Sequence, residues 1–173
     1  MKIIIVIFAF IILLIAGIYG YNYYMFQVKM TKVIEDDSRN KGIDVSVHFR
    51  NYVEFDKLEY DLQNISTDKS MADVFRVFLQ YSEQLKDENF SALIFSYNGN
   101  DKFFIEGSYF NLLGKEYNFQ NPIYTMNHFP ENVYNLNGTH AFETWTGGWL
   151  GVAGKQMEDF NAFHKKWYLE DYK

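Results

Sequence analysis

The chain has 173 residues, of which 48% are hydrophobic and 22% charged, with no cysteine and a formal net charge of −6. The hydrophobic fraction excludes a disordered chain and predicts a packed core, and the length suits one domain better than two. The acidic charge argues against nucleic-acid binding, which needs a basic face. The lack of cysteine excludes a disulfide framework, a thiolate zinc site and a cysteine nucleophile.

The N-terminal segment carries the strongest signal. Residues 3–18 are uninterrupted Ile, Val, Phe, Ala, Leu and Gly, and no charge stands between Lys2 and Lys29. The apolar run 3–21 makes about 28 Å of helix, which spans a hydrocarbon layer. Tyrosines follow at the far end, where an interfacial aromatic belt belongs: Tyr19, Tyr21, Tyr23 and Tyr24. We expect residues 1–26 to be a transmembrane signal anchor that contacts the membrane through residues 3–21.

Two other interpretations of this segment stay open. A cleaved signal peptide needs small residues at −3 and −1 of the cut, and the run after Leu14 has no clean pattern of that kind. The second alternative is that the segment forms a buried helix of a soluble domain. The positive-inside rule hardly decides the orientation of the helix in the membrane, because Lys2 stands on one side of it and Lys29 and Lys32 on the other. The short N-terminal tail before a large domain favours a single-pass protein of the inner (plasma) membrane, with its C-terminal domain outside the cytoplasm.

The rest of the chain divides into a linker and one domain. Residues 27–42 are polar and mixed in charge, which predicts a polar stalk, and residues 43–173 are expected to form a single extracytoplasmic domain. Residues 43–50 alternate between apolar and polar, which is typical of a strand with one buried face. A second strand is expected over 53–62, after a tight turn or a bulge.

Further strands and two main helices follow. Asn98-Gly99 lies between two apolar runs and predicts a hairpin. Residues 70–87 have the apolar spacing of an amphipathic helix, with Ser70 and Asp73 as a capping box, and 155–172 form a closing helix. The predicted fold class is α+β: an N-terminal transmembrane helix, then one domain with a mostly antiparallel sheet of about four strands packed against two main helices.

The sequence evidence for catalytic residues is weak. His140 and Glu143 could do general base work if they shared one helical turn, although such pairs are usually ordinary exposed polar groups. The same two residues with His128 are too few and wrongly spaced for a zinc site. We therefore expect no metal, no cofactor and no enzymatic activity.

The segment 118–151 is the most suggestive for binding, because it interleaves aromatic and asparagine side chains. Aromatic faces beside amides suit a hydroxyl-rich ligand such as a glycan. The candidate ligand-binding residues are Trp145, Trp149, Tyr124, Asn127 and Tyr134. The alternatives are that these rings fill the core under a long loop or form a protein-binding surface.

Two functions follow from this pattern. The first is a membrane-anchored envelope protein whose domain binds a protein partner, either as a component of an envelope complex or as an immunity-type inhibitor, without catalysis. Small acidic domains can mask basic active sites, which favours the inhibitor form. The alternative is a binding module or hydrolase for glycans or lipid-linked substrates that uses residues 118–151.

Overall fold

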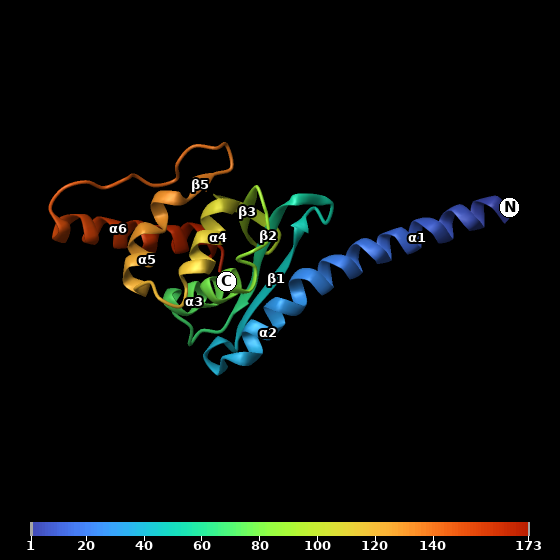
Figure 1. Cartoon of the computed structure of the whole chain (residues 1–173), viewed down its shortest axis with the longest axis horizontal. Coiled ribbons are helices and arrows are strands. Elements are labelled where there is room, and N and C mark those ends of the chain that lie inside the picture. The colour runs from blue at the N-terminus through green and yellow to red at the C-terminus, as the bar shows by residue number, and fades with distance from the viewer. Residues whose placement is uncertain (1, 173) are drawn as a thin grey trace.

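A single unbroken helix joins the N-terminus to the domain in the computed structural model, which describes residues 2–172 except the side chains of Trp149 and Leu150. It consists of α1 (Lys2–Asn22), a π-helical turn η1 (Tyr23–Gln27) and α2 (Val28–Asp36). Its first part projects away from everything else (Figure 1). The helix that begins at Lys2 is long and apolar enough to cross a membrane, a property that signal sequences share.

The second part of this helix packs against the domain. Phe26, Met30 and Val33 lie one helical turn apart and are buried in the core. The segment 27–42, expected to be a polar stalk, is therefore mostly helical and contributes to the core. It ends in a 3₁₀ turn, η2 (Ser38–Asn40), where the buried Asn40 donates a hydrogen bond to the Val33 carbonyl at 2.8 Å.

Within the described residues, the sheet has five strands in the spatial order β1-β2-β3-β4-β5. The strands are β1 (Ile43–Arg50), β2 (Glu54–Ile65), β3 (Ala92–Tyr97), β4 (Asn100–Glu106) and β5 (Tyr134–Asn135). Among these five strands, β2 and β3 pair in parallel and the other neighbours are antiparallel. The predicted α+β class with a mostly antiparallel sheet is confirmed.

Two tight turns set the register of the hairpins. Asn51 and Tyr52 between β1 and β2 have φ of 52° and 64°, and Asn98 and Gly99 between β3 and β4 have φ of 48° and 77°. Positive φ at both central residues is what a type I′ turn requires, and this turn matches the twist of the strands it joins. The register also shifts between Phe49 and Arg50, so the first link contains a bulge as well as a turn.

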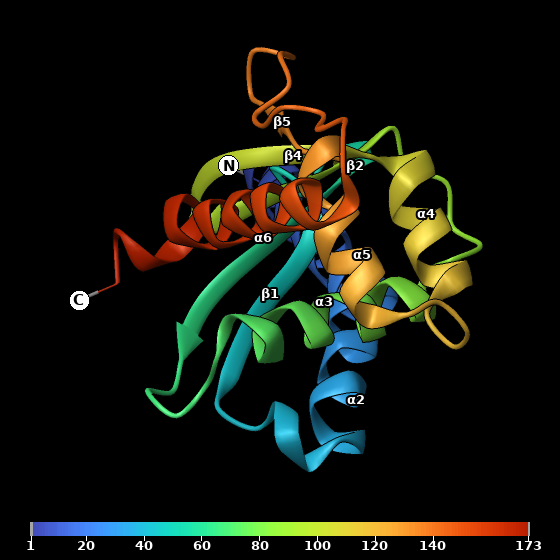
Figure 2. The same ribbon diagram turned by 90° about the vertical axis from the view of Figure 1, so that its left-hand side faces the viewer.

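Helices cover one face of the sheet. They are α3 (Met71–Gln84), α4 (Gly107–Glu116), α5 (Pro122–His128), α6 (Trp149–His164) and the short turns η3 (Pro130–Asn132) and η4 (Lys165–Leu169). Figure 2 shows α3 and α6 in front of the sheet. Aromatic rings fill the space between the layers: Phe95 lies 4.9 Å from Trp167, 5.1 Å from Phe78 and 5.3 Å from Phe163, measured between ring centroids.

The predicted capping box starts α3. The Ser70 hydroxyl accepts the Asp73 backbone N–H at 3.2 Å, and the Asp73 carboxylate accepts the Ser70 backbone N–H at 2.9 Å. The Ser70 hydroxyl also donates to the Asp73 carboxylate at 2.6 Å, and this hydrogen bond is the main cause that lowers the pKa of Asp73 to about 2, followed by the hydrogen bond from the Ser70 backbone. The reciprocal bonds satisfy two backbone donors that a helix start otherwise leaves unpaired.

Candidate functional site

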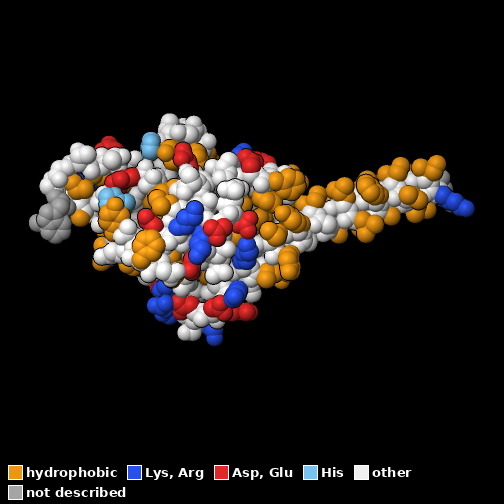
Figure 3. All heavy atoms as spheres, viewed as in Figure 1, with side chains coloured by type: hydrophobic (Ala, Val, Ile, Leu, Met, Phe, Trp, Pro, Cys, Tyr) orange, Lys and Arg blue, Asp and Glu red, His pale blue; other side chains and the backbone are white. Residues whose placement is uncertain are grey.

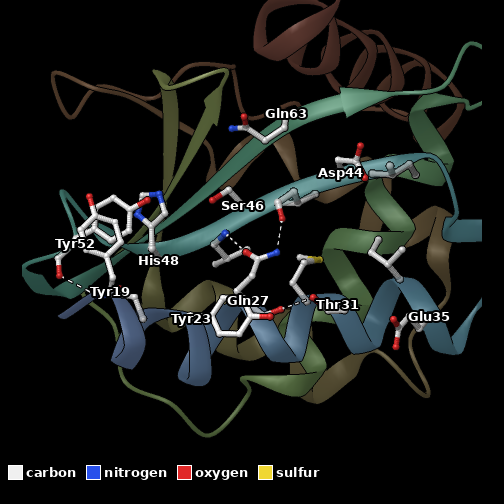
Figure 4. Close-up of a pocket in the computed structure, with 16 residues that line it drawn as sticks. Tyr19, Tyr23, Gln27, Thr31, Glu35, Asp44, Ser46, His48, Tyr52 and Gln63 are labelled. Atoms are coloured by element: carbon white, nitrogen blue, oxygen red, sulfur yellow. Dashed lines mark hydrogen bonds between the residues drawn. The ribbon is translucent and has the colours of Figure 1, made fainter. Parts of the chain in front are cut away.

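A groove of about 440 Å³ lies between the N-terminal helix and the edge strand β1 (Figure 4). The helix supplies one wall and β1 the other, with Tyr52 from the β1–β2 turn and Gln63 from β2 completing it. Its volume is in the range of small-ligand sites. The groove begins at Tyr19, close to the point where the exposed apolar part of the helix leaves the domain.

Two side-chain amides hold the helix against the strand. Gln27 Nε2 donates to the Val45 carbonyl at 3.0 Å, and its Oε1 accepts the Val47 N–H at 2.8 Å. Asn22 accepts the Phe49 N–H at 2.7 Å and donates to the Tyr52 carbonyl at 3.1 Å. An edge strand otherwise presents these backbone groups unpaired. The amides therefore fix the floor of the groove and the angle at which the helix leaves the domain.

The end of the groove nearest the projecting helix is aromatic. The Tyr52 ring lies 4.4 Å from the Tyr19 ring and 4.1 Å from the His48 imidazole, nearly parallel to the latter. Tyr23 is exposed on the helix side of the same end. Burial raises the pKa of Tyr52, so its hydroxyl stays protonated and can donate or accept a hydrogen bond.

The opposite end of the groove is polar and acidic. Thr31 and Glu35 line this end from α2, and Asp44 and Ser46 line it from the side of β1 that is turned toward β2 (Figure 4). None of the described residues that line the groove is Lys or Arg. Such a lining can accept hydrogen bonds and stack against rings, and it offers no cation to neutralise an anionic ligand.

A second polar cluster occupies the sheet face that continues from the groove. Arg50 of β1 pairs with Asp101 of β4 at 2.6 Å, and Ser96 donates to the same carboxylate at 2.9 Å. Glu59 and Asp61 of β2 lie between them and are almost fully buried. Burial raises the pKa of both carboxyl groups. Within residues 2–172, no three His, Asp or Glu side chains converge as metal ligands would.

The two candidate catalytic residues lie on an exposed loop. His140 and Glu143 both line an open depression together with the residues between them. The His140 Nδ1 lies 3.2 Å from the Glu131 carbonyl oxygen, and its ring is 4.5 Å from that of Tyr134. The Nδ1 of His128, the third residue considered as a ligand, lies 3.5 Å from a Glu131 carboxylate oxygen.

The predicted ligand-binding residues lie on α5, on β5, in the loop after β5 and at the start of α6. Tyr124 and Asn127 belong to α5, where Tyr124 is exposed and its ring lies 4.2 Å from that of His128. Tyr134 is in β5 and stacks on Phe104 of β4 at 5.2 Å. These side chains therefore do not share the groove beside β1.

Trp145 is held against α6. Its indole Nε1 donates to an Asp159 carboxylate oxygen at 2.6 Å, and the Lys155 ammonium lies 5.8 Å from the ring centre. The indole is half-buried, so part of its face remains accessible. Trp149 is the first residue of α6, and its side chain lies outside the described part of the structure.

The chain also exposes an apolar surface far from the projecting helix. We call it the α4–α5 surface; its large apolar side chains are Leu112, Phe119, Ile123 and Tyr124, with 45%, 76%, 62% and 52% of their areas exposed. Helix α5 contains no fully buried residue. Apolar side chains gather around α5 at the left of Figure 3, at the opposite end of the molecule from the N-terminus. A cavity of about 320 Å³ between α4 and α5 adjoins this surface.

The groove could not be recognised from local sequence patterns. The sequence does carry one signal for the helix that forms its wall. Phe26, Met30 and Val33 have an i, i+4, i+7 spacing, which indicates a helix packed along one side.

No family model, no curated protein and no solved structure matches the chain.

Proposed function

We propose that this protein is a single-pass membrane protein whose domain lies outside the cytoplasm, binds a protein partner and catalyses no reaction. The apolar helix supplies the anchor in the inner (plasma) membrane. The partner-binding region is the α4–α5 surface, at the far end of the domain from the anchor.

The junction between helix and domain favours an anchor that is retained. The apolar part of α1 continues without a break into Asn22 and Phe26, which are 1% and 2% exposed. Cleavage near residue 20 would therefore cut a helix directly beside residues that stabilise the fold. A protease acts on extended chain, and this segment is helical throughout.

The single observation that carries the partner-binding proposal is the exposure of Ile123 and Tyr124 on a helix of seven residues with no buried side chain. So short a helix is not stable by itself in water. Contiguous exposed apolar groups of this kind mark interaction surfaces. The formal net charge of −6 favours a partner with a basic surface.

The test is affinity purification of the tagged full-length protein from crosslinked native membranes, with wild type compared with Ile123→Glu. A carboxylate in the first turn of α5 suits the helix dipole, so the variant should fold. Leu136→Glu is the matched control, because Leu136 is 52% exposed but lies beyond β5. We expect one stoichiometric partner with wild type and the control, and its loss with Ile123→Glu. No partner in any sample, or equal recovery in all three, would refute the proposal.

A further inference from the structure

We propose that the groove beside β1 binds the neutral saccharide headgroup of a glycolipid drawn from the membrane that holds α1. This inference rests on the membrane anchor proposed above and is independent of the protein partner. It concerns the opposite end of the domain from the α4–α5 surface.

The position of the groove points to a ligand that is itself embedded in a bilayer. The lining begins at Tyr19 and Tyr23, which follow directly on the apolar residues that would cross the membrane. The exposed aromatic side chains at this junction also include Phe55 from the β1–β2 hairpin, which is 61% exposed. Aromatic residues of this kind settle at the headgroup level of a bilayer. A lipid standing beside α1 thus lies next to the aromatic end of the groove without leaving the membrane.

The chemistry of the lining selects among lipid headgroups. The described lining contains two carboxylates, Glu35 and Asp44, and neither Lys nor Arg. An anionic phosphate headgroup would meet like charge there without compensation. Sugar hydroxyls, by contrast, donate hydrogen bonds to carboxylates and exchange them with the hydroxyl and amide groups of Thr31, Ser46 and Gln63.

The aromatic end fits a sugar ring. Tyr52 stacks on His48 and contacts Tyr19, and Tyr23 lies one helical turn after Tyr19 on the helix wall of the groove (Figure 4). Flat faces beside polar groups suit a ring that is apolar on its C–H face and polar at its edge. From Tyr19 to Glu35 the helix rises about 24 Å, long enough for an extended headgroup with its lipid tail still in the bilayer.

The experiment uses the full-length protein in phosphatidylcholine nanodiscs that contain digalactosyldiacylglycerol, phosphatidylethanolamine or phosphatidylglycerol. Native mass spectrometry of protein released from the discs then measures which lipid stays bound. Two pairs of variants isolate the groove: Tyr23→Ala with Tyr24→Ala, and Glu35→Gln with Asp36→Asn. Tyr24 and Asp36 are exposed neighbours of the same chemical type that do not line the groove.

We expect selective retention of the galactolipid, reduced about tenfold by Tyr23→Ala and by Glu35→Gln, the loss expected from removing one hydrogen bond to a charged group or one ring contact. Tyr24→Ala and Asp36→Asn should behave as wild type. Equal retention of all lipids, preference for either phospholipid, or equal effects within each pair would overturn the inference. Extraction of native membranes with carbonate separates the two proposals: protein released by carbonate refutes the anchor, whereas anchored protein without galactolipid refutes this inference alone.

Discussion

Gln27 accepts the backbone N–H of Val47 at 2.8 Å, a hydrogen bond that a neighbouring strand would otherwise make. The amide nitrogen of the same side chain completes the pairing with the Val45 carbonyl at 3.0 Å. The helix thus closes the edge of the sheet at β1. This pairing ties the angle of the N-terminal helix to β1, and the groove lies along the contact between the two.

Removing this pairing should weaken the fold. We expect Gln27→Ala to lower the free energy of unfolding by about 1–3 kcal/mol, because two partly buried backbone groups lose their partner. Gln84→Ala, on the exposed end of α3, should change it by less than about 0.5 kcal/mol. Urea unfolding followed by tryptophan fluorescence measures both. Equal stability of the two variants would mean that Gln27 does not hold the helix in place.

His164 should make the protein less stable in acid. The residue is fully buried beside Phe75, Phe160 and Phe163, and burial lowers its pKa to about 3 from the ordinary 6.5. Between these values the unfolded chain binds a proton that the folded protein does not, so stability falls as pH drops below 6.5. By pH 5 the loss amounts to about 2 kcal/mol.

The variant His164→Phe isolates this effect. Carboxyl groups titrate in the same pH range. Their contributions to stability cancel when the variant and wild type are compared at each pH. Unfolding at pH 7 and pH 5 should show wild type losing about 2 kcal/mol more than His164→Phe. Parallel losses in the two proteins would show that His164 accepts a proton in the folded state.

Glu59 should have the opposite dependence. Burial is the main cause that raises its pKa above 4.5, so its contribution to stability is present below 4.5 and is lost as pH rises through the folded-state value. We expect Glu59→Gln to be more stable than wild type at pH 8, with the advantage shrinking toward pH 4.5. Thermal unfolding at both pH values provides the measurement. Glu143→Gln on an exposed loop is the control, and a pH-independent effect at Glu59 would contradict the prediction.

Gly114 should tolerate no larger residue. A Cβ at this position of α4 would lie 2.2 Å from the Ser82 carbonyl oxygen of α3, so the two helices would have to separate. We expect Gly114→Ala to destabilise the fold by about 2 kcal/mol or more. Gly154→Ala, in open space on α6, should instead stabilise it by about 0.5–1 kcal/mol. Thermal melts that rank the two variants in the reverse order would refute the packing described for α3 and α4.

Local chemistry explains which parts of the fold could be predicted. The alternation over 43–50, the Ser70–Asp73 capping box and the Asn98-Gly99 turn each act within a few residues, and each is present in the structure. The parallel pairing of β2 with β3 depends instead on how α3 crosses between them. No periodicity within one strand carries that information.

The groove depends on contacts across long stretches of chain. Asn22 and Gln27 are five residues apart, and they meet Phe49 and Val47 because the turn between them is π-helical. That turn has no recognisable sequence signal. Residues 27–42 have a polar and charged composition, and this composition predicted a stalk. The helix nevertheless buries the narrow apolar side that Met30 and Val33 form.

The placement of the domain relative to the membrane can be tested directly. The chain contains no cysteine, so a single Asn161→Cys on the exposed side of α6 can be labelled with a membrane-impermeant maleimide in intact cells. We expect labelling from outside the cytoplasmic membrane of a protein that keeps the full mass of the chain, 20.6 kDa plus label, and stays in the membrane fraction. Labelling only after the cells are permeabilised, or a shorter soluble product, would contradict this placement.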